Sequence, residues 1–272
     1  MSLCYALASG KGGVGKSTIA ANLGACLAAG GSRVAIVDAD IGLRSQDALL
    51  SLENRVVYDL IDVADGDCTL EQALLQSEAY PSLFLLPAAQ FSRAKQLDPK
   101  KLGRIIRSLK SSFDYVLIDC PAGIERGLRN VLNAGTDMIL LVVSPDDVSV
   151  RSAERAAQVI DSKEIARPLL IVNHLNSNLI SSGEMMSART VSEIMDLPLL
   201  GEIPEDPAVY RAALRHSLFI SFDCEARRSV FRIAERLQGR NVPFPAYGSR
   251  RPSLFQRLRL KGLREVTPLD DH

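Results

Sequence analysis

The stretch Gly10-Lys11-Gly12-Gly13-Val14-Gly15-Lys16-Ser17 matches the pattern G-x-x-x-x-G-K-[ST]. An apolar segment, Leu3–Ser9, comes directly before it, and a helical pattern, Lys16–Ala29, begins at its end. Glycines let backbone N–H groups turn inward around an anion, and the positive end of the following helix points at the same place. A chance glycine-rich turn would need neither the strand nor the helix. The stretch therefore predicts a phosphate-binding loop.

Each polar residue of this loop has a predicted role. Lys16 can reach the β- and γ-phosphates of a nucleotide, and the Ser17 hydroxyl can bind Mg²⁺, so ATP and Mg²⁺ are the expected ligands. Lys11 is a second lysine, which a plain phosphate loop does not need. It is either a solvated loop residue or a charge that reaches a phosphate, including one held by another subunit. The predicted nucleotide-binding residues of the loop are Gly10, Lys11, Gly12, Gly13, Val14, Gly15, Lys16, Ser17 and Thr18.

Composition limits the class of protein. The 272 residues are 47% apolar and 24% charged, which is typical of a soluble globular chain. No apolar run approaches the roughly 20 residues that span a bilayer, and the N-terminus lacks the basic start of a signal peptide, so we expect a cytoplasmic protein. The five cysteines include no Cys-x-x-Cys pair, which favours reduced thiols over disulfides, zinc or iron–sulfur sites. The zero net charge gives no general attraction to nucleic acid.

Short apolar runs alternate with helical patterns along the chain, which predicts an α/β fold with a mostly parallel twisted sheet flanked by helices. The expected strands are Leu3–Ser9, Arg33–Asp38, Leu83–Pro87, Tyr115–Asp119, Met138–Ser144, Leu169–Asn173 and Leu199–Ile203. The expected helices are Lys16–Ala29, Val57–Ala64, Pro99–Lys110, Gly127–Asn133, Val148–Ile160, Ala188–Met195, Pro207–Ala213 and Cys224–Leu237. We predict a catalytic domain over residues 1–240, a linker over 241–251, an amphipathic helix over 252–265 and a polar tail over 266–272.

Three aspartates lie where predicted strands end. Asp38 and Asp40 follow the run Val34–Val37, and Asp119 ends the run Tyr115–Ile118. Ligands in such sheets bind at the carboxyl ends of strands. Asp119 has the position of a Walker B aspartate, which holds Mg²⁺ directly or through water. Each aspartate alone is as well explained by a turn or a helix cap; three beside a phosphate loop favour a metal-assisted reaction.

Several stretches together resemble a known family. Ser9–Asn22 (SGKGGVGKSTIAAN) resembles the deviant Walker A motif of the MinD/ParA ATPases. Five further stretches resemble the septum-site-determining MinD branch of that family: VDADIGLR (37–44), ENRVVYDLIDV (53–63), LLPAAQ (85–90), DYVLIDCPAGIE (114–125) and GEIPED (201–206). The similarity covers roughly residues 1–240.

The resemblance implies a mechanism. ATP would drive formation of a face-to-face homodimer in which Lys11 contacts the nucleotide of the other subunit. Lys11, Lys16 and Asp40 would be catalytic, with Asp40 positioning the attacking water, and Ser17, Asp38 and Asp119 would form the metal site. The segment Pro121-Ala122-Gly123 would sense the γ-phosphate. The adenine would lie at Asn173, Pro204, Glu205 and Asp206.

The sequence also departs from the family. His174 follows Asn173 where the family usually has arginine, so the arginine's contact with the nucleotide is not carried over. Ser45 and Gln46 replace an Asn-Leu pair in the stretch after Asp40, which leaves partner contacts open.

The end of the chain is basic and amphipathic. Residues 250–272 carry six basic and three acidic side chains, a net +3 against −3 for the rest. On a helical wheel, Leu254, Phe255 and Leu258 share a face, with Arg257 and Lys261 on its flank, whereas Gly262 weakens the helix by roughly 1 kcal/mol relative to Ala. Such a helix suits the interface of an anionic membrane. A helix packed on the domain, or a disordered tail, is the alternative, but MinD-like proteins carry a C-terminal membrane-targeting helix.

The resulting hypothesis is a cytoplasmic ATPase that is peripheral on the inner face of the cell membrane. Its ATP-dependent dimerisation would control membrane binding and placement of the division septum. A MinC-type inhibitor, a MinE-type or other activator and an anionic membrane would be its partners, with no specific nucleic acid. The alternatives are a ParA-type partitioning ATPase, a flagellar-number regulator of the MinD type, and a metabolic enzyme of the superfamily. The metabolic enzyme is disfavoured because the sequence has no pair of cysteines with Cys-x-x-Cys spacing.

Overall fold

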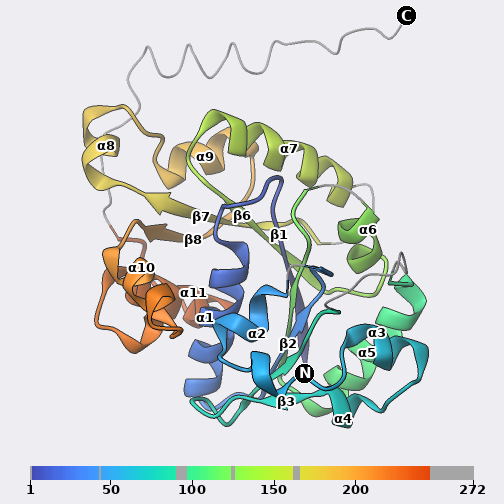
Figure 1. Cartoon of the computed structure of the whole chain (residues 1–272). Helices are drawn as coiled ribbons and strands as arrows, with labels where there is room; N and C mark the ends of the chain where they lie inside the picture. The colour runs from blue at the N-terminus through green and yellow to red at the C-terminus, as the bar shows by residue number, and fades with distance from the viewer. Residues whose placement is uncertain (1, 43, 90–96, 124–125, 162–165, 246–272) are drawn as a thin grey trace, which may run out of the picture.

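The sheet runs through the centre of the molecule, with helices on both faces (Figure 1). The computed structural model describes residues 2–42, 44–89, 97–123, 126–161 and 166–245. Within these residues eight strands form one sheet in the order β3-β4-β2-β5-β1-β6-β7-β8, and every neighbouring pair is parallel except β3 with β4. The predicted fold class, an α/β fold with a mostly parallel sheet, is confirmed.

The strands agree with the sequence prediction to within two residues at each end, apart from one that was not predicted. Their bounds are β1 (Leu3–Ala8), β2 (Val34–Asp38), β3 (Leu75–Gln76), β4 (Leu83–Leu86), β5 (Tyr115–Asp119), β6 (Met138–Val143), β7 (Leu169–Leu175) and β8 (Leu199–Pro204). The missed strand is β3, whose two residues are too short to show an alternating pattern. It pairs antiparallel at the edge of the sheet.

The eight helices predicted within residues 1–240 are all present, and the described part of the chain adds three more α-helices and two single turns of 3-10 helix. The α-helices are α1 (Lys16–Ala29), α2 (Ser45–Leu49), α3 (Leu60–Asp65), α4 (Leu70–Ala73), α5 (Pro99–Ser112), α6 (Arg126–Leu132), α7 (Asp147–Asp161), α8 (Ser177–Ser182), α9 (Ala188–Met195), α10 (Pro207–Leu214) and α11 (Glu225–Leu237). The 3-10 turns are η1 (Glu53–Arg55) and η2 (Phe219–Ser221). The prediction of a helix from Val57 was wrong at its start, because Asp59 caps α3 through a capping box and fixes the first turn at Leu60.

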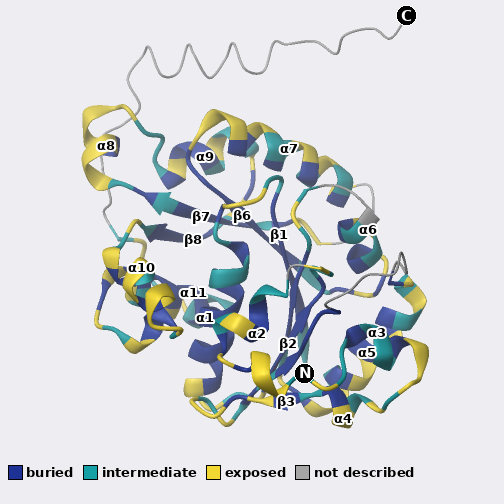
Figure 2. Cartoon of the chain, in the orientation of Figure 1, coloured by how far each residue is buried: buried dark blue, intermediate teal, exposed yellow. Residues whose placement is uncertain are grey.

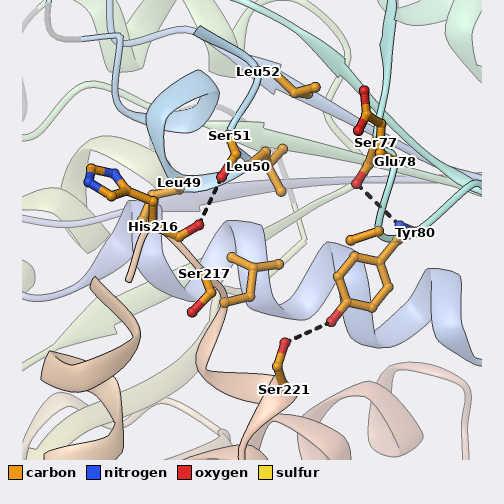
Figure 3. A pocket seen from close by; sticks show the side chains of 12 residues that line it. Leu49, Leu50, Ser51, Leu52, Ser77, Glu78, Tyr80, His216, Ser217 and Ser221 are labelled. Carbon is orange, nitrogen blue, oxygen red and sulfur yellow. Dashed lines mark hydrogen bonds between the residues drawn. The ribbon is translucent and has the colours of Figure 1, made fainter. Parts of the chain in front are cut away.

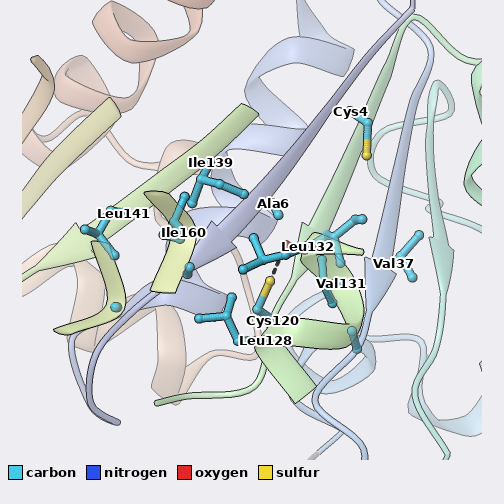
Figure 4. Packing of buried hydrophobic residues seen from close by; sticks show 14 of the residues in the cluster. Cys4, Ala6, Val37, Cys120, Leu128, Val131, Leu132, Ile139, Leu141 and Ile160 are labelled. Atoms are coloured by element: carbon cyan, nitrogen blue, oxygen red, sulfur yellow. Dashed lines mark hydrogen bonds between the residues drawn. The ribbon is translucent and has the colours of Figure 1, made fainter. Parts of the chain in front are cut away.

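Alternate residues of the central strands enter two separate cores. Figure 2 shows that the strands of the sheet are buried, and Figure 4 shows part of the first core. In β1, Cys4, Ala6 and Ala8 face one core, whereas Tyr5 and Leu7 face the other. The first core is covered by α3, α5, α6, α7 and α9, and the second by α1, α10, η2 and α11. Both faces of the sheet are therefore buried, which is why its strands are apolar throughout rather than alternating.

The cysteines belong to this packing. Cys4 and Cys120 lie fully buried in the first core, and burial raises the pKa of the Cys4 thiol to about 12 and that of Cys120 further still. All five cysteines are free thiols. Cys120 is therefore a packing residue of the first core.

The described chain ends in a segment that α11 holds against the sheet. The Arg236 guanidinium donates to the carbonyl oxygens of Leu200, Val242 and Pro243 at 2.8, 3.1 and 3.0 Å, and its carbon lies 3.7 Å from the centre of the Phe244 ring. This contact joins the segment after α11 to the start of β8. The predicted membrane residues Leu254, Phe255, Arg257, Leu258 and Lys261 lie outside the described residues, and the domain bounds remain predictions.

No α-helix in the described ranges combines the length and the apolar character needed to cross a bilayer.

Glu202 is a carboxylate in the interior of β8. It is 8% exposed, and its Oε1 atom has no hydrogen-bond partner. Burial raises its pKa to about 7, although the positive charges of Arg236, Arg232 and Arg189 oppose the shift. Between the ordinary value near 4.5 and about 7, the folded chain consequently binds more protons at this site than the unfolded chain does.

We therefore predict that Glu202 makes the free energy of unfolding fall as the pH rises from about 4.5 to about 7. Glu202→Gln removes the titrating group, so this part of the pH dependence should disappear. Urea denaturation at several pH values measures it, with Glu71→Gln, at an exposed carboxylate, as the control. If both variants kept the slope of the parent chain, the account of Glu202 would be wrong.

Candidate nucleotide-binding site

The glycine-rich loop joins the end of β1 to the start of α1. Gly13 and Gly15 have φ values of 80° and 87°, in the left-handed region that residues with a Cβ atom rarely adopt. Gly15 directly precedes α1, whose first residue is Lys16. A Cβ atom on Gly15 would also lie 2.4 Å from the Asn173 Nδ2 atom. The loop therefore needs glycine here both for its backbone conformation and for the close approach of β7.

Gly10 makes a second close approach. A Cβ atom at this position would lie 2.2 Å from the carbonyl carbon and oxygen of Ser152, in the backbone of α7. The phosphate loop thus packs directly on α7. The Gly123 N–H donates to the carbonyl of Ser9, the residue just before the loop, at 3.0 Å. The predicted γ-phosphate-sensing segment therefore also contacts the start of the loop.

Two of the predicted aspartates meet at the centre of the sheet. Asp38 and Asp119 are the last residues of β2 and β5, they are register partners, and both side chains are fully buried. The Lys16 ammonium forms an ion pair with the Asp119 Oδ1 atom and lies 3.4 Å from the Ser17 Oγ atom. Lys16 is 6% exposed, so the charge of Asp119 is balanced inside the protein. The structure thus brings Lys16, Ser17, Asp38 and Asp119 together.

Gln46 completes this cluster. Its Nε2 atom donates to the Asp119 Oδ2 atom at 2.7 Å and to the Ser17 carbonyl at 3.0 Å, and its backbone N–H donates to the Asp38 Oδ2 atom at 3.1 Å. The sequence showed Gln46 as a departure from the family but gave it no role. Its position results from α2, the short helix that begins at Ser45 and was not predicted.

Burial perturbs the carboxylates of this cluster. Burial, and secondarily the charge of Asp119, raises the pKa of Asp38 to about 7, although N–H groups of Gln46 and Asp40 stabilise its charged form. Burial also raises the pKa of the partly exposed Asp40. Buried carboxylates of this kind are stabilised by a cation, so the donor set fits Mg²⁺.

No set of three or more His, Cys, Asp or Glu side chains among the described residues converges enough to hold an ion unaided.

Lys11 has its charge partner outside this cluster. Its Nζ atom lies 3.1 and 3.2 Å from the two carboxylate oxygens of Asp146, which precedes α7. Asp146 also accepts the Ser149 N–H at 2.8 Å, as a helix-capping aspartate does. Sequence reasoning missed Asp146, because it reads as an ordinary cap. Within one chain, then, Lys11 is paired with Asp146 rather than with a residue of the buried cluster.

A cavity of about 590 Å³ opens next to the loop. The predicted adenine-site residues Asn173, Pro204, Glu205 and Asp206 line it, together with Gly15 and Thr18 from the loop and α1. The Asn173 Nδ2 atom donates to the Val14 carbonyl at 2.9 Å, which ties the cavity wall to the loop. The cavity is therefore continuous with the phosphate loop and large enough for a nucleoside.

The cavity walls include side chains that the sequence did not single out. Ile19, Val209, Tyr210 and Phe219 supply apolar surface suited to a planar base. His174 also lines the cavity; its backbone φ is 60°, and burial lowers its pKa, so a neutral imidazole is favoured near neutral pH. Its Nδ1 atom lies 3.4 Å from the Ser144 Oγ atom.

A smaller hollow of about 240 Å³ lies at the other end of α2 (Figure 3). The Ser51 hydroxyl donates to the His216 carbonyl at 2.8 Å, and the Tyr80 and Ser221 hydroxyls lie 3.4 Å apart. These bonds connect the segment after α2 and the β3–β4 loop to the residues that follow α10. The same short segment therefore touches the buried cluster of Lys16, Asp38 and Asp119 at Gln46 and the residues just after α10 at Ser51.

Comparison with known sequences assigns the family. The CobQ/CobB/MinD/ParA nucleotide binding domain matches residues 5–219. The septum site-determining protein MinD of Helicobacter pylori is 41% identical over 92% of this chain and 96% of its own length. MinD of Bacillus subtilis is also 41% identical, over 87% and 89% of the two chains. The chain belongs to the MinD family of ATPases.

Solved structures of MinD proteins agree with this assignment. MinD in a MinC:MinD complex from Aquifex aeolicus has a TM-score of 0.83 at 35% identity, over 91% of this chain and 100% of that one. Pyrococcus horikoshii MinD, solved with Mg-ADP, has a TM-score of 0.78 at 29% identity over 87% and 96%. The family resemblance read from the sequence is thus confirmed.

Gly10 and Gly12 provide a matched test of the loop's packing. Gly10→Ala should lower the thermal stability of the nucleotide-free protein, because the new methyl group overlaps the Ser152 backbone, which cannot move aside as a flexible side chain can. The expected loss is about 1–3 kcal/mol. Gly12→Ala should have little effect, since no atom lies within 4 Å of the place that a Cβ atom would take there. Equal melting temperatures for the two variants would contradict this contact.

Proposed function

We propose that this chain is an Mg²⁺-dependent ATP hydrolase whose nucleotide state controls its dimerisation, its residence on the membrane and the placement of the division septum. The observation that carries the proposal is the buried cluster of Lys16, Asp119, Gln46 and Asp38 at the start of α1. Such a cluster needs a polyanion and a divalent cation as its natural ligands. The MinD relatives give the biological process.

The residues would divide the work as follows. Backbone N–H groups of the loop and the positive end of α1 would bind the phosphates, and Lys16 would leave Asp119 to contact the β- and γ-phosphates. The Ser17 hydroxyl would hold Mg²⁺, with Asp38 and Asp119 ordering its water shell. When bound, Mg²⁺ neutralises phosphate charge. Asp40 would orient the water that attacks the γ-phosphorus as the bond to ADP breaks.

Lys11 would act on the other subunit. Its ion pair with Asp146 is partly exposed, with side-chain exposures of 34% and 47%, so breaking it costs little. In an ATP-bound homodimer Lys11 would exchange this partner for a phosphate across the interface. A cation supplied in trans neutralises charge in the transition state, as an arginine finger does. Hydrolysis would thus depend on dimerisation.

The proposed membrane contact is the amphipathic segment 252–265. One short helix binds weakly, whereas two helices on a dimer gain roughly 10²–10⁴-fold through effective concentration if both reach the surface. The chain would be a peripheral protein on the inner face of the cell membrane. A MinC-type inhibitor is a proposed partner, since a MinD similar to this chain was solved with MinC. A MinE-type or other activator would trigger hydrolysis.

The tail is tested by its removal. Deleting residues 252–272 should abolish cosedimentation with vesicles that contain anionic lipid, while ATP binding is kept. The full chain should sediment with ATP and stay in solution with ADP. The tail hypothesis fails if the truncated chain still sediments, and the switch fails if the full chain binds equally with either nucleotide.

The trans-acting lysine is tested by Lys11→Ala. We expect nucleotide binding to persist, but ATP-dependent dimerisation to be lost and dimer-activated turnover to fall by about 10³-fold, the lower range for a trans-acting cation. Size-exclusion chromatography with light scattering measures the oligomeric state, and the release of phosphate measures the rate of ATP hydrolysis. Lys100→Ala on α5 is the control. A Lys11→Ala chain that dimerised and hydrolysed ATP normally would exclude the role.

A further inference from the structure

The outer face of α10 has an unusual surface for a soluble domain. Tyr210 and Leu214, four residues apart, are 69% and 64% exposed. Arg211 and Arg215, also four residues apart, are exposed beside them. Tyr210 and Leu214 are neighbours on α10 because side chains four residues apart lie next to each other on a helix. Arg211 belongs to the same helix, and Arg215 caps its C-terminal end. We call these four side chains the α10 face.

Neither arginine of the α10 face forms an ion pair with another described residue. Within the described ranges no carboxylate pairs with Arg211 or Arg215: Arg211 bonds weakly to the Pro207 carbonyl at 3.4 Å, and Arg215 lies 5.9 Å from the centre of the Phe222 ring. Single exposed apolar side chains need no explanation. An exposed Tyr–Leu pair flanked by two unpaired arginines is the composition of helices that lie in a membrane interface.

The charge of the chain is divided at the start of α10. Residues 1–206 hold 19 basic and 26 acidic side chains, a net −7, whereas residues 207–245 hold seven arginines and three carboxylates, a net +4. The tail that follows adds +3. An anionic surface would therefore repel most of the domain and attract the part that contains α10.

The tail keeps the domain near any surface that it binds. Arg236 fixes the chain at Val242 and Pro243, and six residues, 246–251, separate Pro245 from the amphipathic segment. Six extended residues span at most about 20 Å. A domain tethered this closely must turn one of its faces to the membrane, and the charge distribution favours the face formed by 207–245.

We propose that the α10 face is a second membrane contact, with Tyr210 and Leu214 in the lipid interface and Arg211 and Arg215 on anionic headgroups. This inference rests on the proposed membrane binding of the tail, because the tail brings the domain to the surface. The chain's own tail helix is not the occupant, since it is basic like the α10 face. Nucleic acid would satisfy the arginines but not Leu214.

The α10 face also borders the nucleotide. Tyr210 lines the base cavity, and the His216 carbonyl just after α10 accepts the hydrogen bond from Ser51 beyond α2. A lipid contact on α10 would therefore lie next to both the base and the segment that carries Gln46.

The chain contains no tryptophan, which permits a direct test. Leu214→Trp, outside the cavity lining, places a single fluorophore on the α10 face of the full chain, and Val57→Trp places one at a 79% exposed site in the acidic part. With ATP and phosphatidylglycerol vesicles brominated on their acyl chains, the emission of Leu214→Trp should shift to shorter wavelength and be quenched. The emission of Val57→Trp should stay unchanged.

The charges are tested separately. Arg211→Gln with Arg215→Gln should weaken partition of the ATP-bound chain to anionic vesicles by about tenfold or more. Arg104→Gln with Arg107→Gln removes the same charge from exposed sites on α5 and should change partition much less.

The outcomes separate the two proposals. If the full chain fails to sediment with vesicles in any nucleotide state, membrane binding itself is wrong and this inference falls with it. If the chain sediments but the emission of Leu214→Trp is unchanged, the tail alone binds and the α10 contact is wrong. If duplex DNA rather than lipid shifts that emission, the α10 face is a nucleic-acid surface instead.

Discussion

The buried ion pair between Lys16 and Asp119 is the constraint around which the rest of the site is arranged. Burying two full charges costs desolvation energy. That cost is offset when the charges pair with each other and their remaining donor and acceptor atoms form hydrogen bonds. The Gln46 side chain donates such a hydrogen bond to Asp119, and the backbone N–H groups of Asp40 and Gln46 donate to the neighbouring Asp38. The sheet order β2-β5-β1 is what makes this possible, because it puts the ends of three strands side by side. An arriving nucleotide would therefore compete for partners that are already in place.

Much of this organisation could be predicted from sequence, and the reasons for the exceptions are physical. The continuous apolar run of β5 and the 14-residue α1 were placed to the residue. The short α2 was missed because five residues are too few to show a helical period. In addition, no residue typical of a turn marks the left-handed backbone of Arg44, which directly precedes the helix. The loop lysine and the strand-end aspartates follow from local pattern. The contacts of Gln46 and Asp146 arise from residues 73 and 135 positions away, which no local pattern reveals.

Two different kinds of attachment organise the C-terminal part. Its apolar residues join the second core through η2 and α11, whereas Arg236 fixes the outgoing chain by hydrogen bonds to main-chain oxygens. Main-chain contacts of this sort do not depend on the side chains of residues 242 and 243. The point at which the tail leaves the domain is thus set by one arginine, and the sequence of the tail is left free to suit its own surroundings.

Gly10 has a consequence for how the molecule can move. Its Cα atom approaches the backbone of Ser152 so closely that not even a methyl group fits between them. Packed interiors transmit displacement because they have little free volume. The phosphate loop and α7 are therefore in direct backbone contact at Gly10, so a displacement of the loop towards α7 would have to move α7 as well. Gly10 thus joins the loop to α7, in addition to shaping the loop that would bind the anion.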